Sequence, residues 1–253
     1  MNTNSDLWYP ESLFPTDNDL EVPTLRLDVQ PNGVEIPFVL FGEQARTFDM
    51  EGNGVLHFYT DDYRFTSIFS NPQKVLKARP RNIVEPNYSL FTETPMAFGL
   101  QMIYKKRYFS RLMQEQGIGV FVDLNVASKY YKVNLLGVPA GYRSFCTRGY
   151  ADRVVNLEFE YNLAKSIAGD NELLFVIYGG GFECRRFAQK HNCIYVTPLV
   201  SIKKKVNTLK GLEKIKESVM FVEQGDTSKL LESTIQKVLT SQVENYTEKV
   251  IEQ

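Results

Sequence analysis

The sequence predicts an α/β protein of parallel β/α repeats, a TIM-barrel-like or incomplete barrel with an N-terminal hairpin and a C-terminal helix. From residue 54 onward, short apolar runs alternate with helical stretches, as in parallel strands joined by crossover helices. Six such units favour a barrel over a doubly wound sheet. The chain has 253 residues, 43% of them hydrophobic, which is enough for a sizeable core.

The expected strands are short apolar runs, at residues 55–60, 82–91, 119–126, 140–147, 172–179 and 193–200. Helical patterns separate most of them, from about 61 to 79 and at 94–117, 153–169 and 182–192. The helix at 94–117 is the clearest, because Thr94 can cap it, Pro95 suits its first turn and Gly117 can end it.

Two extensions flank the β/α domain, which we place at 54–202. In the extension 1–53, Pro31-Asn32-Gly33 lies between two apolar-rich runs and predicts a hairpin. The extension 203–253 is highly charged, and apolar residues recur at helical spacing from Ser228 onward. This pattern predicts an amphipathic helix that docks on the body of the protein or meets a partner protein, and we favour docking.

The net charge of −1 is unevenly distributed. Residues 1–60 hold ten acids and two bases (−8), whereas residues 61–160 hold fourteen bases and nine acids (+5). A basic middle could face phosphates, or the acidic start of the chain could pack beside it. The pI of about 6.2 favours the second interpretation and argues against strong nucleic-acid binding.

Several classes of protein are disfavoured by composition. An apolar run of about 18 residues, as a membrane span needs, does not occur, and the acidic start is unlike a signal peptide. The three cysteines have no CxxC spacing, which disfavours a disulfide framework or a cysteine zinc site. We therefore expect a cytoplasmic protein with no membrane partner.

Polar residues follow the expected strands, and the carboxyl ends of parallel strands are where such folds place their sites. The first strand is followed by Asp61 and Asp62, the second carries Glu85, and the third carries Asp123. Asn87, Tyr88 and Ser89 are expected at the same edge as substrate-binding residues.

These carboxylates have three possible roles. Asp61, Asp62 and Asp123, with Glu85, could bind Mg²⁺ or Mn²⁺, which prefer oxygen ligands. They could instead raise one another's pKa and act as acid and base. Alternatively, Asp61 caps the next helix and pairs with Arg64, while Asp62 is solvated.

Three arginines could neutralise the charge of a substrate. Arg107 and Arg111 lie on the apolar stripe of the long helix, where a base should pair with an acid, reach a ligand or extend past the end of the stripe. Arg143 is expected near the end of the fourth strand. Lys105 and Lys106 are interpreted as ordinary surface residues.

A glycine turn lies between the fifth strand and the helix after it. Tyr178 is followed by Gly179, Gly180 and Gly181, and backbone N–H groups at such a junction can bind phosphate. Arg185 and Arg186 follow in the helix. The turn is neither GxGxxG nor a Walker loop, so an ordinary glycine turn is the alternative. His57 and His191 have no partners that predict a metal site or a catalytic triad.

Three segments together resemble a known family. They are FYTDDYRFTSIFSNPQKV, EPNYSLFTETPMAFGLQMIYKKRYFSRLMQEQGIGVFVDLNV and YGGG. Over about residues 54–200 the chain resembles the phage- and mobile-element-associated family called domain of unknown function 4417. The family has no assigned chemistry, and its pattern has an aspartate where this chain has Asn87. If that aspartate is catalytic in relatives, this chain lacks it.

Two functional hypotheses follow. The first is an enzyme acting on nucleic acid or a nucleotide, with the carboxylates and arginines at the strand ends and a glycine turn near a phosphate. The second is a non-catalytic module of a mobile element that binds DNA or a protein. An enzyme needs the carboxylates close together, whereas a binding module leaves them in caps and surface pairs.

Overall fold

The computed structural model describes residues 10, 13–42 and 50–198. The chain divides into two compact units, Met1–Arg148 with Asp152–Val176, and Gly149–Ala151 with Ile177–Gln253. None of the helices in the described part of the chain is long and apolar enough to cross a membrane. The predicted C-terminal helix lies outside the described residues.

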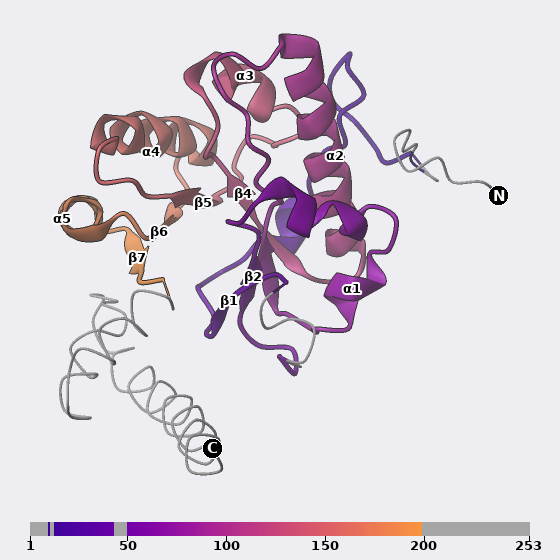
Figure 1. Ribbon diagram of the computed structural model, residues 1–253, viewed down its shortest axis with the longest axis horizontal. Helices are drawn as coiled ribbons and strands as arrows, with labels where there is room; N and C mark the ends of the chain where they lie inside the picture. The colour runs from indigo at the N-terminus through magenta and orange to yellow at the C-terminus, as the bar shows by residue number, and fades with distance from the viewer. Residues whose placement is uncertain (1–9, 11–12, 43–49, 199–253) are drawn as a thin grey trace. The chain divides into compact units, whose positions relative to one another are not determined.

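In the described part of the chain, seven strands form one sheet whose strand order equals their order in the sequence (Figure 1). This order is that of a TIM-like barrel, which has eight strands, and not of a doubly wound sheet. Strands β1 and β7 are the two ends of the order, so the barrel is incomplete. The predicted α/β class, with parallel β/α repeats in an incomplete TIM-like barrel, is confirmed. The strands are β1 (Phe38–Leu40), β2 (Val55–His57), β3 (Asn82–Val84), β4 (Gly119–Asp123), β5 (Ser144–Arg148), β6 (Leu174–Tyr178) and β7 (Ile194–Val196).

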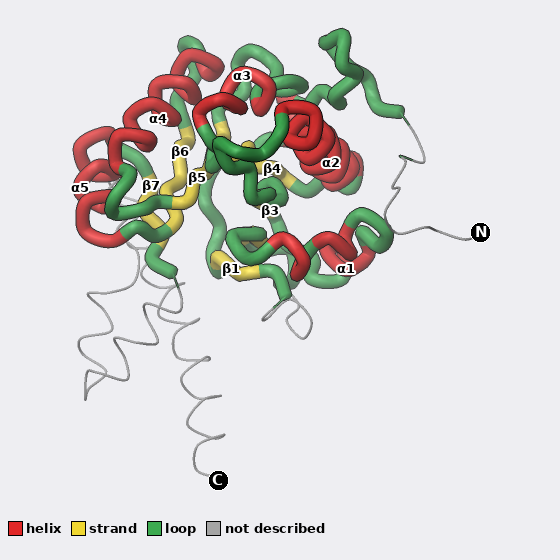
Figure 2. The backbone as a smooth tube through the Cα atoms, turned by 45° about the horizontal axis from the view of Figure 1, so that its top comes forward, coloured by secondary structure: helices red, strands yellow, loops and turns green. Residues whose placement is uncertain are grey.

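In the first unit, β1 to β5 pair in parallel, so their carboxyl ends lie along one edge. Helices and strands alternate along the chain (Figure 2). Because buried parallel strands are covered by helices, they appear in sequence as apolar runs. The helices are α1 (Gln73–Leu76), α2 (Met96–Glu115), α3 (Tyr131–Asn134) and α4 (Val154–Ala168), with 3-10 turns at Leu27–Val29, Asp62–Arg64, Thr66–Ile68 and Ser128–Tyr130.

The core of the first unit lies between strands β1 to β4 and helix α2. Leu56, Ile83 and Val120 from successive strands are completely buried, and Ile103 and Phe109 of α2 join the same cluster. The predicted helix is confirmed as α2, but its first turn differs from the expectation. Thr94 makes no side-chain cap to α2; its Oγ1 accepts a hydrogen bond from the Phe91 N–H at 3.2 Å.

The predicted N-terminal hairpin does not form. Strand β1 pairs in parallel with β2, and the earlier apolar run contains a 3-10 turn in place of a strand. The segment of the expected turn is held by β5 and the residue before it: the Arg143 N–H donates to Gln30 Oε1 at 2.8 Å and Ser144 Oγ donates to the Pro31 carbonyl at 2.7 Å. These long-range contacts outweigh the local turn signal.

In the second unit, α5 (Gly181–His191) precedes β7. The end of β6 pairs with β7, because the Gly179 N–H donates to the Val196 carbonyl at 2.9 Å. The Gly149 N–H donates to the Tyr178 carbonyl, also at 2.9 Å. The predicted strand, helix and strand at 172–200 are therefore confirmed in order.

Candidate functional site

Four charged side chains form a completely buried group at the carboxyl ends of β3 and β4, which we call the buried cluster: Glu85, Lys106, Arg107 and Asp123. Arg107 Nη1 lies 2.7 Å from Glu85 Oε1. Lys106 Nζ lies 3.8 Å from Glu85 Oε2 and 3.7 Å from Asp123 Oδ2. Two cations therefore compensate two anions in a region without solvent.

Backbone carbonyls complete the coordination of both bases. Arg107 donates to the carbonyl oxygens of Asn134 and Leu136, at 2.7 Å and 3.1 Å. Lys106 Nζ donates to the carbonyl of Asp123 at 3.1 Å. Buried charges need such partners, since an unpaired one would cost several kcal/mol. The cluster is thus a satisfied ionic network.

The Asp123 carboxylate has hydrogen-bond donors on both oxygens. Tyr59 Oη donates to Oδ1 at 3.1 Å, and Asn87 Nδ2 donates to Oδ2 at 2.9 Å. Burial raises the pKa of Asp123, and the attraction of Lys106 opposes that shift. Burial likewise lowers the pKa of Lys106, and the two carboxylates oppose it. With both oxygens engaged and no exposed surface, Asp123 is held as a structural acceptor.

Asp61 and Asp62 are not part of this cluster. Asp62 accepts hydrogen bonds from the Ser89 N–H, at 3.1 Å to Oδ2, and from Ser89 Oγ, at 3.0 Å to Oδ1. Asp61 is exposed and pairs with Arg64 at 3.7 Å, without capping a helix. We call the contact between Asp62 and Ser89 the loop clamp, because it joins the loops after β2 and β3.

The three aspartates are therefore in three different settings: one is exposed, one is in the loop clamp and one is buried. Across the described ranges, no group of three or more His, Cys, Asp or Glu side chains is arranged to hold a metal ion. The arrangement matches surface pairing for Asp61 and a loop contact for Asp62. A role of these residues in binding Mg²⁺ or Mn²⁺ stays a prediction.

The predicted substrate-binding residues have different positions. Asn87 is buried and bridges Asp123 to the carbonyl of Asn125, to which its Nδ2 donates at 3.0 Å. Tyr88 packs in the core, stacked on Phe69 with ring centroids 5.8 Å apart. Ser89 is exposed and forms the loop clamp. Asn87 is thus part of the support for Asp123.

The remaining arginines do not meet at the strand carboxyl ends. Arg111 pairs with Glu115 at 2.8 Å and donates to the Thr24 carbonyl. Arg143 precedes β5, so it lies at the amino end of that strand, where Nη2 donates to Asn32 Oδ1 at 2.6 Å. Its predicted place at the carboxyl ends is wrong, because β5 begins later than its sequence pattern indicates.

The glycine turn is in the second unit. Gly179, Gly180 and Gly181 all have positive φ, and a Cβ on Gly180 would lie 2.3 Å from Cys184 Sγ. Backbone conformation and close packing therefore account for the glycines. Arg185 lies 5.2 Å from the Tyr195 ring centroid, and Arg186 pairs with Glu183 at 3.9 Å. Phosphate binding by this turn, with Tyr178 beside it, stays a prediction.

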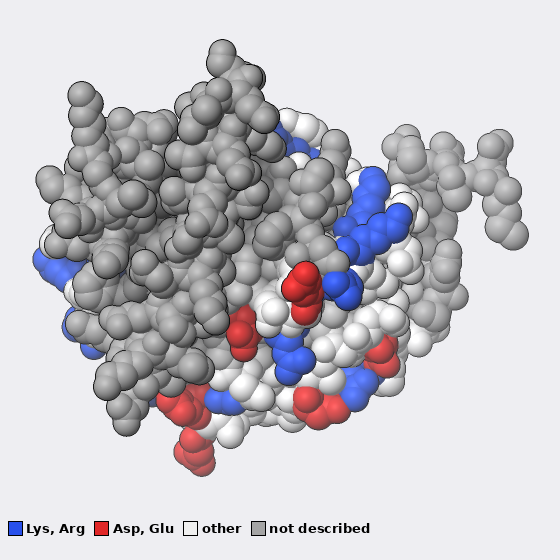
Figure 3. All heavy atoms as spheres, turned by 90° about the horizontal axis from the view of Figure 1, so that it is seen from below, with Lys and Arg blue, Asp and Glu red and all other residues white. Residues whose placement is uncertain are grey.

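A basic surface follows β2 in the first unit. Between Asp62 and Glu85 the sequence contains five bases and no acid. All five are exposed, and we call them the basic ridge: Arg64, Lys74, Lys77, Arg79 and Arg81. The ridge runs from the loop after β2, along α1, to the start of β3. Figure 3 shows Lys and Arg side chains on the described surface seen from below, with acidic side chains among them.

Three members of the ridge make no ion pair with any residue in the described part of the chain: Lys74, Lys77 and Arg81. Arg64 is partly neutralised by Asp61. Glu51 is exposed in the turn where the Gly52 N–H donates to the Arg79 carbonyl at 2.8 Å, so an acid also lies in this region. The ridge is nevertheless more positive than the chain as a whole.

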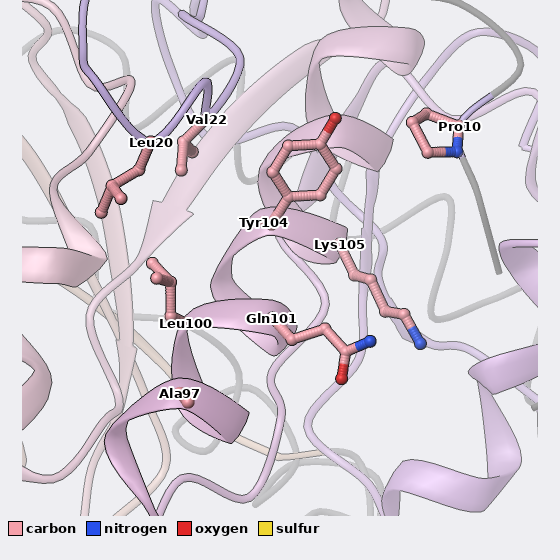
Figure 4. A pocket seen from close by; sticks show the side chains of 8 residues that line it. All are labelled: Pro10, Leu20, Val22, Ala97, Leu100, Gln101, Tyr104 and Lys105. Atoms are coloured by element: carbon pink, nitrogen blue, oxygen red, sulfur yellow. The ribbon is translucent and has the colours of Figure 1, made fainter. Parts of the chain in front are cut away.

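A separate apolar pocket lies between α2 and Pro10, Leu20 and Val22 of the N-terminal segment (Figure 4). Its volume is about 340 Å³, and Leu20, Val22, Leu100 and Tyr104 contribute to its lining. Among the described residues that line it, Lys105 is the one with a charged side chain. The pocket contains none of the predicted site residues.

Residues 14–197 match the family described as Domain of unknown function (DUF4417). The match covers well over half of the chain. The chain belongs to this family. The predicted resemblance is confirmed, and the match begins before the predicted residue 54, consistent with β1 pairing with β2 in the sheet.

Two curated phage proteins are similar to the family member described here. The chain is 29% identical to the Gene 1 protein of Mycobacterium phage L5 over 140 residues, which is 53% of this chain and 61% of the relative. It is 30% identical to the Gene 1 protein of Mycobacterium phage D29 over 115 residues, or 42% of this chain and 40% of the relative. The chain thus matches less than two thirds of either relative. No solved structure matches it.

Sequence reasoning missed two buried groups. Lys106 was interpreted as surface, because the acids that surround it come from other segments. Glu160 of α4 is buried, and its Oε2 has no hydrogen bond of ordinary geometry in the described structure. Burial raises the pKa of Glu160 to about 8, and nearby Thr147 opposes the shift. An acid in line with the apolar residues Leu157, Ala164 and Ala168 of one helix face is the signal that could have found Glu160.

Proposed function

We propose that this family member is a nucleic-acid-binding module of a phage or mobile element and that the basic ridge contacts phosphates. The observation that supports the proposal is a run of five exposed bases without an acid in the same stretch of sequence. Nucleic acids carry regularly spaced negative charge, so clustered Lys and Arg side chains are the expected footprint.

Binding is favoured over catalysis because of what the carboxylates do. An enzyme using Asp61, Asp62 and Asp123 needs them close together, but they pair with Arg64, with Ser89 and with the buried cluster. Burial also separates Arg107 from any substrate at the surface. Every charged group that the enzyme hypothesis assigns to catalysis has a structural partner.

The net charge of the chain does not decide whether it binds nucleic acid, because the attraction between basic side chains and phosphates is local. At physiological salt, charges beyond about 8 Å are largely screened, so the acidic start of the chain affects the ridge little unless it lies beside it. A pI of about 6.2 still argues for moderate affinity and strong salt dependence. The cytoplasm of a bacterial host is the compartment in which such a module would meet nucleic acid.

The test is fluorescence anisotropy with labelled DNA at several salt concentrations. Lys74→Gln/Lys77→Gln should weaken binding at low salt about tenfold and make the salt dependence shallower by about 1–2 units of log K per log salt, since two phosphate contacts are lost. The matched control is Lys132→Gln/Lys165→Gln, which removes two exposed lysines from α3 and α4. Equal affinity of wild type and both variants would overturn the proposal.

A second assay addresses the enzyme hypothesis directly. Titration calorimetry with Mn²⁺ compares the wild type with Asp61→Asn/Asp123→Asn, and thermal unfolding checks that the variant folds. On the binding proposal, neither protein takes up Mn²⁺ saturably. Saturable binding that disappears in a folded variant would favour the carboxylate enzyme, and nuclease and nucleotide-hydrolysis assays would follow.

A further inference from the structure

We infer that the nucleic acid bound along the ridge is single-stranded and that its bases stack on Tyr63 and Phe91. This inference rests on the proposed function and specifies its substrate. Both rings are largely exposed, Tyr63 at 72% and Phe91 at 63%, although aromatic side chains usually bury most of their surface. They belong to neighbouring loops, after β2 and β3, at the Arg64 end of the ridge.

The first ring carries a positive charge beside it. The Arg64 guanidinium carbon lies 5.8 Å from the centroid of the Tyr63 ring, and its Nε donates to Tyr63 Oη at 3.3 Å. A base stacked on Tyr63 would therefore have a cation within reach of its own phosphate. Single-strand binders use the same arrangement, in which an aromatic ring for the nucleobase lies beside a positively charged side chain for the phosphate.

The second ring is on a loop fixed by hydrogen bonds. The loop clamp joins Asp62, directly before Tyr63, to Ser89, two residues before Phe91. On the C-terminal side of Phe91 in the sequence, Thr94 Oγ1 accepts a hydrogen bond from the Phe91 N–H. Because both backbones are held, the two rings lose little conformational freedom on binding, which favours affinity.

Stacking distinguishes single strands from duplexes. In a duplex the bases already stack on one another, so exposed rings at a surface find no free base face. In a single strand, each base stacked on an aromatic ring contributes about tenfold or more to affinity, whatever its identity. Exposed aromatic rings next to the Lys and Arg side chains of the ridge therefore fit a single strand better than a duplex.

Two acids near Tyr63 and Phe91 limit where the phosphates of a bound strand can lie. Asp61 is paired with Arg64, and Glu93 is exposed in the same loop as Phe91. They would repel a phosphate placed directly above them, so the backbone must follow the ridge while the bases point to the rings. The same exposed rings would suit an apolar protein partner, but the exposed Lys and Arg side chains of the ridge favour a polyanion.

The experiment measures binding of a labelled oligothymidine and of a duplex of equal length. Tyr63→Ala/Phe91→Ala should lower affinity for the single strand about tenfold or more and change duplex affinity less than about twofold. The matched control is Phe182→Ala, which removes a ring that is 73% exposed in the second unit and should change neither. Circular dichroism and thermal unfolding show whether each variant is folded.

A competitor separates stacking from charge. An abasic strand of the same length carries the phosphates without the bases, and we expect it to compete at least tenfold more weakly than oligothymidine. Equal competition, or equal loss of single-strand and duplex binding in a folded Tyr63→Ala/Phe91→Ala, would overturn the inference. If Lys74→Gln/Lys77→Gln still weakened binding of both ligands, the proposed function would stand without it.

Failure of the proposed function has a different signature. In that case, neither ligand binds the wild type, or both bind equally well to the ridge variant. Binding of a protein in place of nucleic acid, lost in Tyr63→Ala/Phe91→Ala, would overturn both proposals together.

Discussion

The buried cluster and the basic ridge use the same kinds of charged side chain in opposite ways. In the cluster, Arg107 has a carboxylate and two carbonyls around it and no exposed surface. On the ridge, exposed Arg64 lies 3.7 Å from Asp61, and Lys74 has no ion pair with the described residues. Charges that are fully compensated maintain the fold, whereas charges that face solvent are available to a ligand.

The largest expected effect tests the structural side of this comparison. Arg107→Met leaves buried Glu85 with the more distant Lys106 as its remaining cation and removes two hydrogen bonds to carbonyls, so it should lower the free energy of unfolding by about 3–5 kcal/mol. Arg64→Met removes a solvent-exposed pair and should cost less than about 1 kcal/mol. Urea unfolding followed by circular dichroism measures both. Similar costs for the two variants would remove the distinction between the two regions.

A second prediction concerns the dependence of stability on pH. The pKa of Glu160 is about 8 in the folded protein, well above the ordinary value of a glutamate. Its contribution to stability is therefore complete below the ordinary value and is lost as pH rises through the folded pKa. Relative to the Glu160→Gln variant, the wild type should lose on the order of 2–4 kcal/mol between about pH 5 and pH 9.

Exposed Glu172 provides the control for this measurement. The Glu172→Gln variant should follow the wild type across the whole pH range, because its carboxyl remains in solvent. Thermal unfolding at several pH values gives all three curves. A wild type and a Glu160→Gln variant that respond identically to pH would mean that water or a cation reaches the Glu160 carboxylate.

Substitution of Asp61 should have the smallest effect on binding, but the two functional hypotheses predict opposite directions for it. If the ridge binds phosphates, Asp61→Asn frees Arg64 and removes a repelling charge, so affinity for the single strand should rise about two- to threefold at low salt. The matched control, Asp28→Asn, changes another exposed aspartate that pairs with an arginine, Arg26 at 2.6 Å, and should have no effect. A loss of binding in Asp61→Asn would favour the carboxylate hypothesis instead.

Much of the fold was predictable from local patterns. The runs that became β4 and β6 are buried and nearly continuous in apolar residues, and a buried parallel strand has this signature whatever surrounds it. The hairpin prediction failed because Asn32 and its neighbours form contacts with Arg143 and Ser144, more than a hundred residues away. A local turn pattern carries no information about contacts between residues so far apart in the sequence.

The candidate site was predictable in position but not in organisation. The sequence placed Asp61, Asp62 and Asp123 near strand ends, which is correct. It could not show that Lys106 lies between Glu85 and Asp123, because that position depends on how α2 packs against β4. Solvent exposure could not be read from the sequence either. The five basic residues of the ridge could be identified as a candidate binding surface only once the structure showed that all five are exposed.

The partners of Arg107 have a consequence for folding kinetics. Its three hydrogen bonds reach residues 22 to 29 positions away, on both sides of it in the sequence. The guanidinium can leave water only after β3, α2 and the end of α3 have come together, so we expect its interactions to form late in folding. Arg107 should therefore mainly slow unfolding and hardly change the folding rate, which makes it a determinant of how long the native state persists.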